Sequence, residues 1–205
     1  MALELNVLIS AVGAISSLVK DTVVSVQAIR SGWMAKNDEA KEQLAESLKQ
    51  LQESLQHAGE LSLAAESYFQ TYENIVELLS LSRRAERFLK DNMDELRDRR
   101  NPNYEGDWRV LEAMFETIDS RRDAPQKVVL DRAQWYDKDD KAQIELLLQQ
   151  FTASYERAST HLRHKVADDL AYELQGTNRS LQDSYTLLRN TLYDKILRTL
   201  QKLGP

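Results

Sequence analysis

The chain has 205 residues, of which 27 are Lys or Arg and 33 are Asp or Glu, so its net charge is −6. This acidic balance argues against nucleic acid as a partner, because proteins that bind nucleic acid need a strongly basic surface. The sequence contains no Cys, which excludes disulfides, thiolate nucleophiles and Cys-type zinc sites. The length suits one domain that buries a hydrophobic core, and we expect a single helical-bundle domain over residues 1–205.

The first expected helix covers residues 2–31. Its apolar positions repeat at alternating steps of four and three, which predicts one seam. Many of its residues are β-branched and lower the helix propensity, so packing against protein or lipid must stabilise it. Its uncharged stretch, residues 5–19, is shorter than the roughly 20 residues that span a bilayer. We expect it to contact a membrane or other copies of the chain through Leu5, Leu8, Ile9, Val12, Ile15, Val19, Val23, Val26 and Trp33.

A different interpretation of residues 2–31 stays open, because a central helix of a multi-helix bundle is apolar on several sides for packing reasons alone. Small residues such as Ala11, Gly13 and Ala14 would permit close helix contact in either setting.

The beginning of the chain resembles the N-terminal helical domains of HeLo-type cell-death proteins and the four-helix bundle of the mixed-lineage kinase-like pseudokinase. The residues that carry the resemblance are Met1-Ala2-Leu3-Glu4-Leu5-Asn6-Val7-Leu8-Ile9-Ser10-Ala11-Val12-Gly13-Ala14-Ile15, followed by polar Leu-rich helices. The resemblance implies a bundle that acts on membranes through its N-terminal region once it oligomerises. It would make residues 1–31 the effector element and the rest of the chain its sheath.

A second helical segment is expected from an N-cap at Asn37 or Asp38. Leu44, Leu48, Leu51 and Leu55 start a coiled-coil-like 4-3-4 spacing. The spacing continues through Ala58, Ser62, Ala65, Phe69, Tyr72, Val76 and Leu79. Nothing forces a stop before Arg100, so residues 38–100 form either one long helix or two helices. Two helices would turn at His57-Ala58-Gly59 and form a projecting hairpin within 38–100.

Near the end of this segment, cations concentrate and suggest a site for anionic lipid headgroups or phosphate. The residues are Arg83, Arg84, Arg87 and Lys90, followed by Arg97, Arg99 and Arg100. Ion pairs between residues four apart and the helix macrodipole also explain such cations.

The remaining elements are punctuated by Pro and Gly. Residues 101–106 are expected to be a loop, 107–121 a shorter helix with Trp108 in the core, and 122–138 an irregular segment that Trp135 and Tyr136 pin to the helices. The next helix is expected from Asp139 or Asp140 to Leu174, with Gly176 ending it and Thr177 or Asn178 capping the last helix. Its seam is Ile144, Leu148, Phe151, Tyr155, Ala158, Leu162, Val166, Leu170 and Leu174; that of the last helix is Leu181, Tyr185, Leu188, Leu192, Ile196, Leu200 and Leu203.

His161, His164 and Asp168 would share a helix face, but no second ligand group accompanies them, so we infer a solvated polar face and expect no metal and no cofactor. The predicted fold is therefore all-α, an elongated multi-helix bundle of long amphipathic helices. We expect a non-enzymatic interaction module whose partner is a protein or a second copy of the chain, in the cytoplasm and peripheral at a membrane. A purely structural scaffold without a membrane role is the alternative.

Overall fold

The computed structural model describes the backbone of residues 38–203, and these residues contain helices and no strand. The predicted all-α class is therefore confirmed for the described part of the chain. The helix expected over residues 2–31 lies outside it. The chain divides into two compact units, one of which is Ser67–Thr191, and the side-chain contacts below belong to that unit. The single-domain organisation stays a prediction.

The first described helix, α2, runs without a break from Asp38 to Asp91. The turn considered at His57–Gly59 is wrong, because these residues lie inside α2, which leaves no hairpin turn there. The helix nevertheless ends before Arg100. The side-chain amide of Asn92 donates a hydrogen bond to the carbonyl oxygen of Phe88 at 2.8 Å, which competes with helical bonding. A short helix, α3, then covers Met93–Arg97.

Helix α4 covers Tyr104–Asp119 and begins earlier than expected, so the loop predicted over residues 101–106 is too long and Gly106 lies inside the helix. The earlier start follows from an Asx turn in which the Asn101 side chain accepts the Asn103 amide hydrogen at 2.9 Å. Helix α5, Ala124–Asp131, carries Pro125 in its first turn, where proline is tolerated. The 3₁₀ helix η1, Ala133–Trp135, follows, so the segment expected to be irregular is largely helical.

Helices α6, Lys138–His164, and α7, Ala167–Leu203, are separated at Lys165, so the break predicted at Gly176 is wrong. Lys165 adopts the left-handed conformation with φ 54° and ψ 47°. The amide groups of Lys165 and Val166 donate to the carbonyl oxygens of Leu162 and His161, both at 3.0 Å, as in a Schellman motif.

Gly176 serves packing and not helix termination. A Cβ atom built on Gly176 would lie 3.5 Å from the Ser154 hydroxyl oxygen, so α6 and α7 approach closely there. Thr177 and Asn178, the residues expected to cap the last helix, are buried inside α7.

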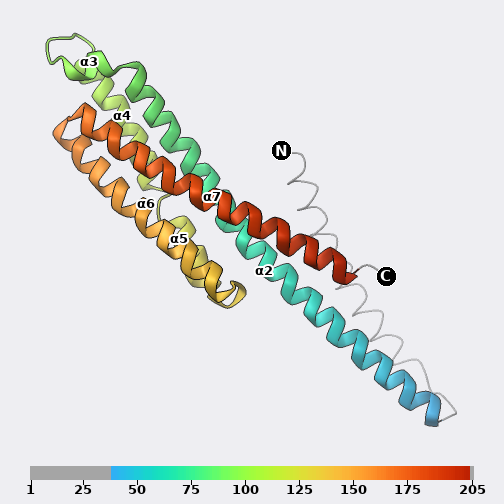
Figure 1. Ribbon diagram of the computed structural model, residues 1–205. Helices are drawn as coiled ribbons and strands as arrows, with labels where there is room; N and C mark the ends of the chain where they lie inside the picture. The colour runs from blue at the N-terminus through green and yellow to red at the C-terminus, as the bar shows by residue number, and fades with distance from the viewer. Residues whose placement is uncertain (1–37, 204–205) are drawn as a thin grey trace. The chain divides into compact units, whose positions relative to one another are not determined.

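Within Ser67–Thr191, the parts of α2, α4, α6 and α7 that belong to this unit lie side by side with alternating direction (Figure 1). The Tyr72 and Tyr185 rings connect α2 to α7, with centroids 5.3 Å apart, and the Phe115 and Tyr155 rings connect α4 to α6 at the same separation. The unit is thus a helical bundle built from antiparallel neighbours.

The predicted seams account for half of the buried apolar residues in the described part of the chain. Trp108 is fully buried, as expected. Two seam residues are misplaced, since Val76 and Val166 are each 38% exposed. On α2, Ile75 and Leu78 are fully buried instead, because the buried face of this helix is rotated from the predicted seam. The predicted seam residues that are buried are Ala65, Tyr72, Leu79, Ile144, Leu148, Phe151, Tyr155, Ala158, Leu162, Leu170, Leu174, Leu181, Leu188 and Leu192.

Candidate functional site

The apolar residues proposed as a membrane or oligomer element, Leu5 to Val26 together with Trp33, lie outside the described residues. Among the helices of residues 38–203, none is long and apolar enough to cross a bilayer.

The predicted headgroup residues lie near the end of α2, and two of the four have polar partners. The Arg83 guanidinium donates to the side-chain oxygen of Gln182 at 2.6 Å. The Lys90 ammonium lies 2.6 Å from a carboxylate oxygen of Glu86, one helical turn away. Arg84 and Arg87 are both exposed. Their spacing places these two guanidinium groups on one solvent-facing side of α2.

Glu86 ties this basic group to the neighbouring helix. Its second carboxylate oxygen accepts a hydrogen bond from the side-chain amide of Asn178 on α7, at 2.5 Å. Glu86 therefore pairs with Lys90 while it joins α2 to α7, so the Lys90 charge is already neutralised within the bundle. The charges of Arg84 and Arg87, in contrast, face solvent.

Two further ion pairs fasten the region around the α6–α7 turn. Arg97 pairs with Asp168, and this hydrogen bond lowers the pKa of the Asp168 carboxyl and raises the pKa of the guanidinium. Lys165 lies 2.7 Å from Glu105, whose pKa the ammonium lowers, and 5.5 Å from the centre of the Tyr104 ring. Both ion pairs are solvent-exposed, and each adds little to stability because water and salt screen it.

The histidine group considered at the sequence level does not form one cluster. Asp168 contacts Arg97, whereas the Nδ1 atom of His161 lies 3.7 Å from Asp169. Within the described residues, no group of three His, Asp or Glu side chains is arranged to hold a metal ion.

A buried hydroxyl network joins α2 to the segment before α6, and no pattern in the sequence indicates it. The Tyr136 hydroxyl donates to the carbonyl oxygen of Ser67 at 2.8 Å and lies 2.7 Å from the hydroxyl of Thr71. The Tyr68 hydroxyl donates to the Asp140 carboxylate at 2.7 Å and accepts the backbone amide hydrogen of Asp137 at 3.0 Å. The predicted pinning by the Trp135-Tyr136 pair is thus confirmed for Tyr136.

Burial governs the acid–base properties of this network. Desolvation raises the pKa of Tyr68, and its hydrogen bond to Asp140 raises it further. Desolvation also raises the pKa of Tyr136, although Thr71 opposes the shift. Both phenols therefore stay protonated and act as hydrogen-bond donors through the neutral pH range. The network fastens helices; it does not activate a nucleophile.

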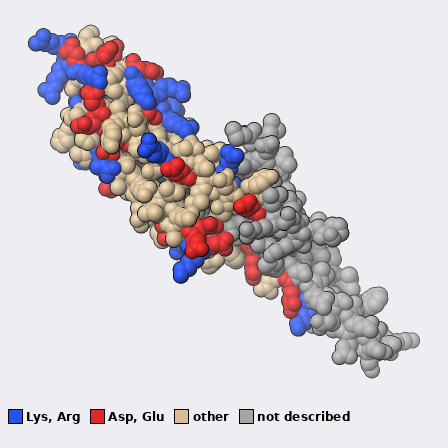
Figure 2. Space-filling model, viewed as in Figure 1, with Lys and Arg blue, Asp and Glu red and all other residues tan. Residues whose placement is uncertain are grey.

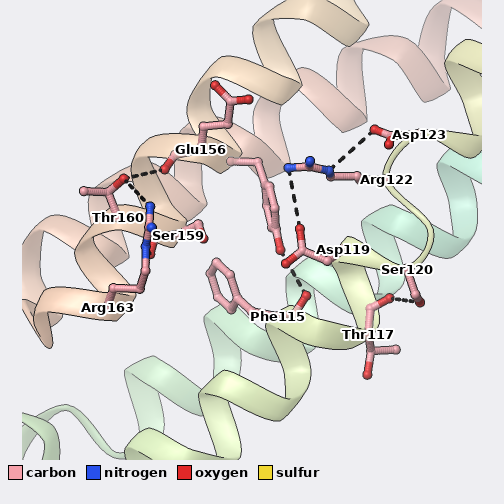
Figure 3. Close-up of polar contacts among 11 residues, drawn as sticks. Phe115, Thr117, Asp119, Ser120, Arg122, Asp123, Glu156, Ser159, Thr160 and Arg163 are labelled. Atoms are coloured by element: carbon pink, nitrogen blue, oxygen red, sulfur yellow. Dashed lines mark hydrogen bonds and ion pairs between the residues drawn. The ribbon is translucent and has the colours of Figure 1, made fainter.

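A third buried phenol, that of Tyr155, joins α6 to α4 beside Phe115 and Asp119, two residues that Figure 3 labels. The Tyr155 hydroxyl donates to the carbonyl oxygen of Phe115 at 3.0 Å, and the two rings are stacked. Desolvation raises the pKa of Tyr155, and the nearby Asp119 carboxylate raises it further. Arg122 lies 3.6 Å from Asp119, which places a cation beside that carboxylate.

Several apolar side chains face solvent in the described part of the chain. In Figure 2, charged side chains gather at the end of the bundle near α3, and both acidic and basic side chains also lie elsewhere along the bundle. The most exposed apolar side chains in this unit are Tyr172 at 75%, Leu130 at 59% and Leu146 at 54%. Exposed apolar groups are candidates for contact with a protein partner.

No family model, curated protein or solved structure matches this chain. The candidate surfaces therefore rest on their own geometry and chemistry.

Proposed function

We propose that this chain is a non-enzymatic helical interaction module that assembles with itself or with a protein partner, and that residues 2–31 then engage a membrane. The observation that carries the proposal is the series of helix contacts inside residues 67–191. Side chains join α2 to α7, α4 to α6 and α6 to α7. Such a bundle would act as a scaffold for residues 2–31, the proposed effector segment.

The charges of the chain act in two ways on its approach to an anionic membrane. The net charge of −6 opposes approach to an anionic surface. Arg84 and Arg87 oppose this effect locally, because both are exposed on one side of α2 and can reach the same headgroup phosphate. The protein would work in the cytoplasm and bind peripherally, with lipid contact made by the apolar face of residues 5–26.

The test is dye release from liposomes of neutral and of anionic composition. The full chain is compared with the variant Val12→Asp/Ile15→Asp. A matched control, Val76→Asp/Val110→Asp, adds the same charge at two side chains that are 38% and 40% exposed on the bundle. We expect leakage with the parent and the control and none with the first variant, while circular dichroism shows that all three are helical. Absence of leakage by the parent at every lipid composition would refute the membrane step.

A second candidate function, a structural scaffold without a membrane role, is favoured by the length of α2, which is continuous for 54 residues. Long uninterrupted helices are common in proteins that hold partners apart. Deletion of residues 1–31 separates the two proposals. A releasable effector leaves a helical remainder that unfolds cooperatively, whereas a core helix takes the fold with it.

A further inference from the structure

The turn between α6 and α7 reverses the chain without a glycine or a proline. Lys165 and Val166 alone separate the two helices. Lys165 has a φ of 54°, and no other non-glycine residue in the described part of the chain has a positive φ. This left-handed conformation is strained for a residue with a Cβ atom. Short hinge segments under strain favour the exchange of an element between copies of a chain.

The residues around this turn are also compatible with one continuous helix. Every fourth residue from Leu162 to Leu174 is apolar, so the apolar seam of α6 continues across the turn into α7. The spacing predicts one helix through this point, whereas the structure has two. Straightening the turn would return Lys165 to an ordinary helical φ of about −63° and would remove its strain.

Contacts with α3 and α4 hold the turn closed. The Lys165 ammonium lies 2.7 Å from the Glu105 carboxylate and 5.5 Å from the centre of the Tyr104 ring. Beside it, Arg97 of α3 pairs with Asp168 of α7. Both ion pairs are exposed and contribute little to stability. Most of the stability of the closed form therefore comes from the packing of α7 on the other helices, and α7 of a second copy can supply the same packing.

The contacts between α6 and α7 are symmetric about Lys165 in sequence. Each of three contacting pairs has one residue before Lys165 and one residue equally far after it: Arg157 with Glu173, His161 with Asp169, and Ser154 with Gly176. The two helices lie side by side and run in opposite directions (Figure 1). Two straightened helices can therefore lie antiparallel about a two-fold axis at Lys165, and each of these contacts then forms between the chains in the same register.

This symmetry identifies the occupant as a second copy, because the exchanged α7 takes the place that it has in the monomer. Contacts across the shared face pair charges of opposite sign, as Arg157 with Glu173 does at 3.0 Å. The repulsion between two net charges of −6 acts mostly at long range, where salt screens it. At the axis, the two Lys165 ammonium groups would face each other without Glu105, so this lysine favours the monomer.

We propose that the α6–α7 turn is a hinge through which two copies of this chain exchange α7, with both helices straightened at Lys165. The Glu105–Lys165 ion pair keeps the hinge closed in the monomer. The dimer becomes populated only at high protein concentration, because proximity favours closing the turn within one chain. The inference names a route for the self-assembly part of the proposed function, on which its biological role rests, and it does not depend on the membrane step.

The first experiment compares Lys165→Ala with Lys165→Gly. Both variants lose the ion pair with Glu105, so they differ chiefly in backbone preference: alanine favours a continuous helix, and glycine favours the left-handed turn. The parent and both variants are unfolded in urea and refolded at about 10 µM to about 1 mM, and light scattering measures their molar masses.

We expect the association constant of the alanine variant to exceed that of the glycine variant on the order of a hundredfold, because each dimer contains two hinges. Monomers in every sample, or equal association of the two variants, would overturn the inference. Circular dichroism checks that both variants are as helical as the parent.

The second experiment distinguishes exchange from ordinary association. The chain contains no Cys, so Ser154→Cys/Gly176→Cys in the Lys165→Ala background introduces the only two thiols. A Cβ atom built on Gly176 lies 3.8 Å from the Ser154 Cβ atom, a separation that suits a disulfide. The monomer would close this disulfide within one chain, whereas the exchanged dimer would close it between chains.

After oxidation, the dimer and monomer fractions are separated and run on non-reducing denaturing gels. We expect covalent dimers in the dimer fraction and disulfide-closed single chains in the monomer fraction. Single chains alone in the dimer fraction would show that copies associate without exchange, and would refute the hinge. The liposome assay separates this inference from the proposed function. Exchanged dimers that release no dye would leave the hinge standing and refute the membrane step, whereas dye release by a chain that never exchanges would do the reverse.

Discussion

The Tyr155 hydroxyl donates to the carbonyl oxygen of Phe115 at 3.0 Å, and the same two residues stack their rings, so one side chain joins α6 to both the backbone and the core face of α4. Tyr155 is fully buried. Tyr155→Phe would keep the ring contact and lose the hydrogen bond. We expect the free energy of unfolding to fall by about 1 kcal/mol, measured by urea denaturation.

The control for this variant is Tyr172→Phe, the same chemical change at a side chain that is 75% exposed. We expect its effect to stay within about 0.5 kcal/mol. Equal losses in the two variants would show that the buried hydrogen bond contributes nothing specific.

The buried phenols predict a loss of stability in alkali. The pKa values of Tyr68, Tyr136 and Tyr155 are raised in the folded chain above the ordinary value of 10.0, chiefly by burial. Above that pH the unfolded chain releases protons that the folded chain retains, so the free energy of unfolding falls as pH rises. Each phenol contributes a slope of up to about 1.4 kcal/mol per pH unit.

Urea denaturation between about pH 9 and pH 11, across the tyrosine titration, measures this slope. Tyr155→Phe should show a shallower slope than the parent, because one shifted phenol is gone. An unchanged slope in this variant would contradict the assignment of Tyr155 as one of the shifted groups.

The contact between Tyr136 and Thr71 predicts a non-additive pair of substitutions. Their hydroxyl oxygens are 2.7 Å apart in a buried setting. Tyr136→Phe alone leaves the Thr71 hydroxyl without this partner and should cost about 1–3 kcal/mol. The double variant with Thr71→Val should cost less than the sum of the two single variants, since it removes both polar groups. A double-mutant cycle from urea denaturation checks this, and strict additivity would exclude direct coupling.

The continuity of α7 predicts that Gly176→Ala stabilises the protein. Gly176 lies inside α7, and an added Cβ atom would meet Ser154 at an ordinary contact distance of 3.5 Å. Alanine is favoured over glycine in a helix interior by about 1 kcal/mol, so the melting temperature should rise. If the helix ended at Gly176 in a left-handed conformation, the same change would lower the melting temperature.

A feature of this fold could be predicted from the sequence where its signal lies in a short stretch of the chain. The α6 seam from Ile144 to Leu162 was predictable because its 4-3 spacing is strict and each member is a large apolar residue or alanine. The helix break was not, since a glycine at a close helix contact, such as Gly176, looks the same in sequence as one that ends a helix. Lys165, which takes the left-handed conformation without being a glycine, offers no compositional signal.

The buried hydroxyl network could not be predicted from the sequence, for another reason. Thr71 and Tyr136 are 65 residues apart, and Tyr68 and Asp140 are 72 residues apart. Neither pairing leaves a periodic trace along the chain, because each depends on which helices become neighbours.

The tight turn at Lys165 bears on the order of folding. Contacts between α6 and α7, such as Arg157 with Glu173, join residues only a few helical turns either side of this turn, so little chain entropy is lost in closing them. Contacts between α2 and α7 close far longer loops, 99 residues for Arg83 with Gln182. We therefore expect α6 and α7 to form the folding nucleus as a local helical hairpin, with α2 docking in a later step, so that substitutions at the α2–α7 contact mainly accelerate unfolding.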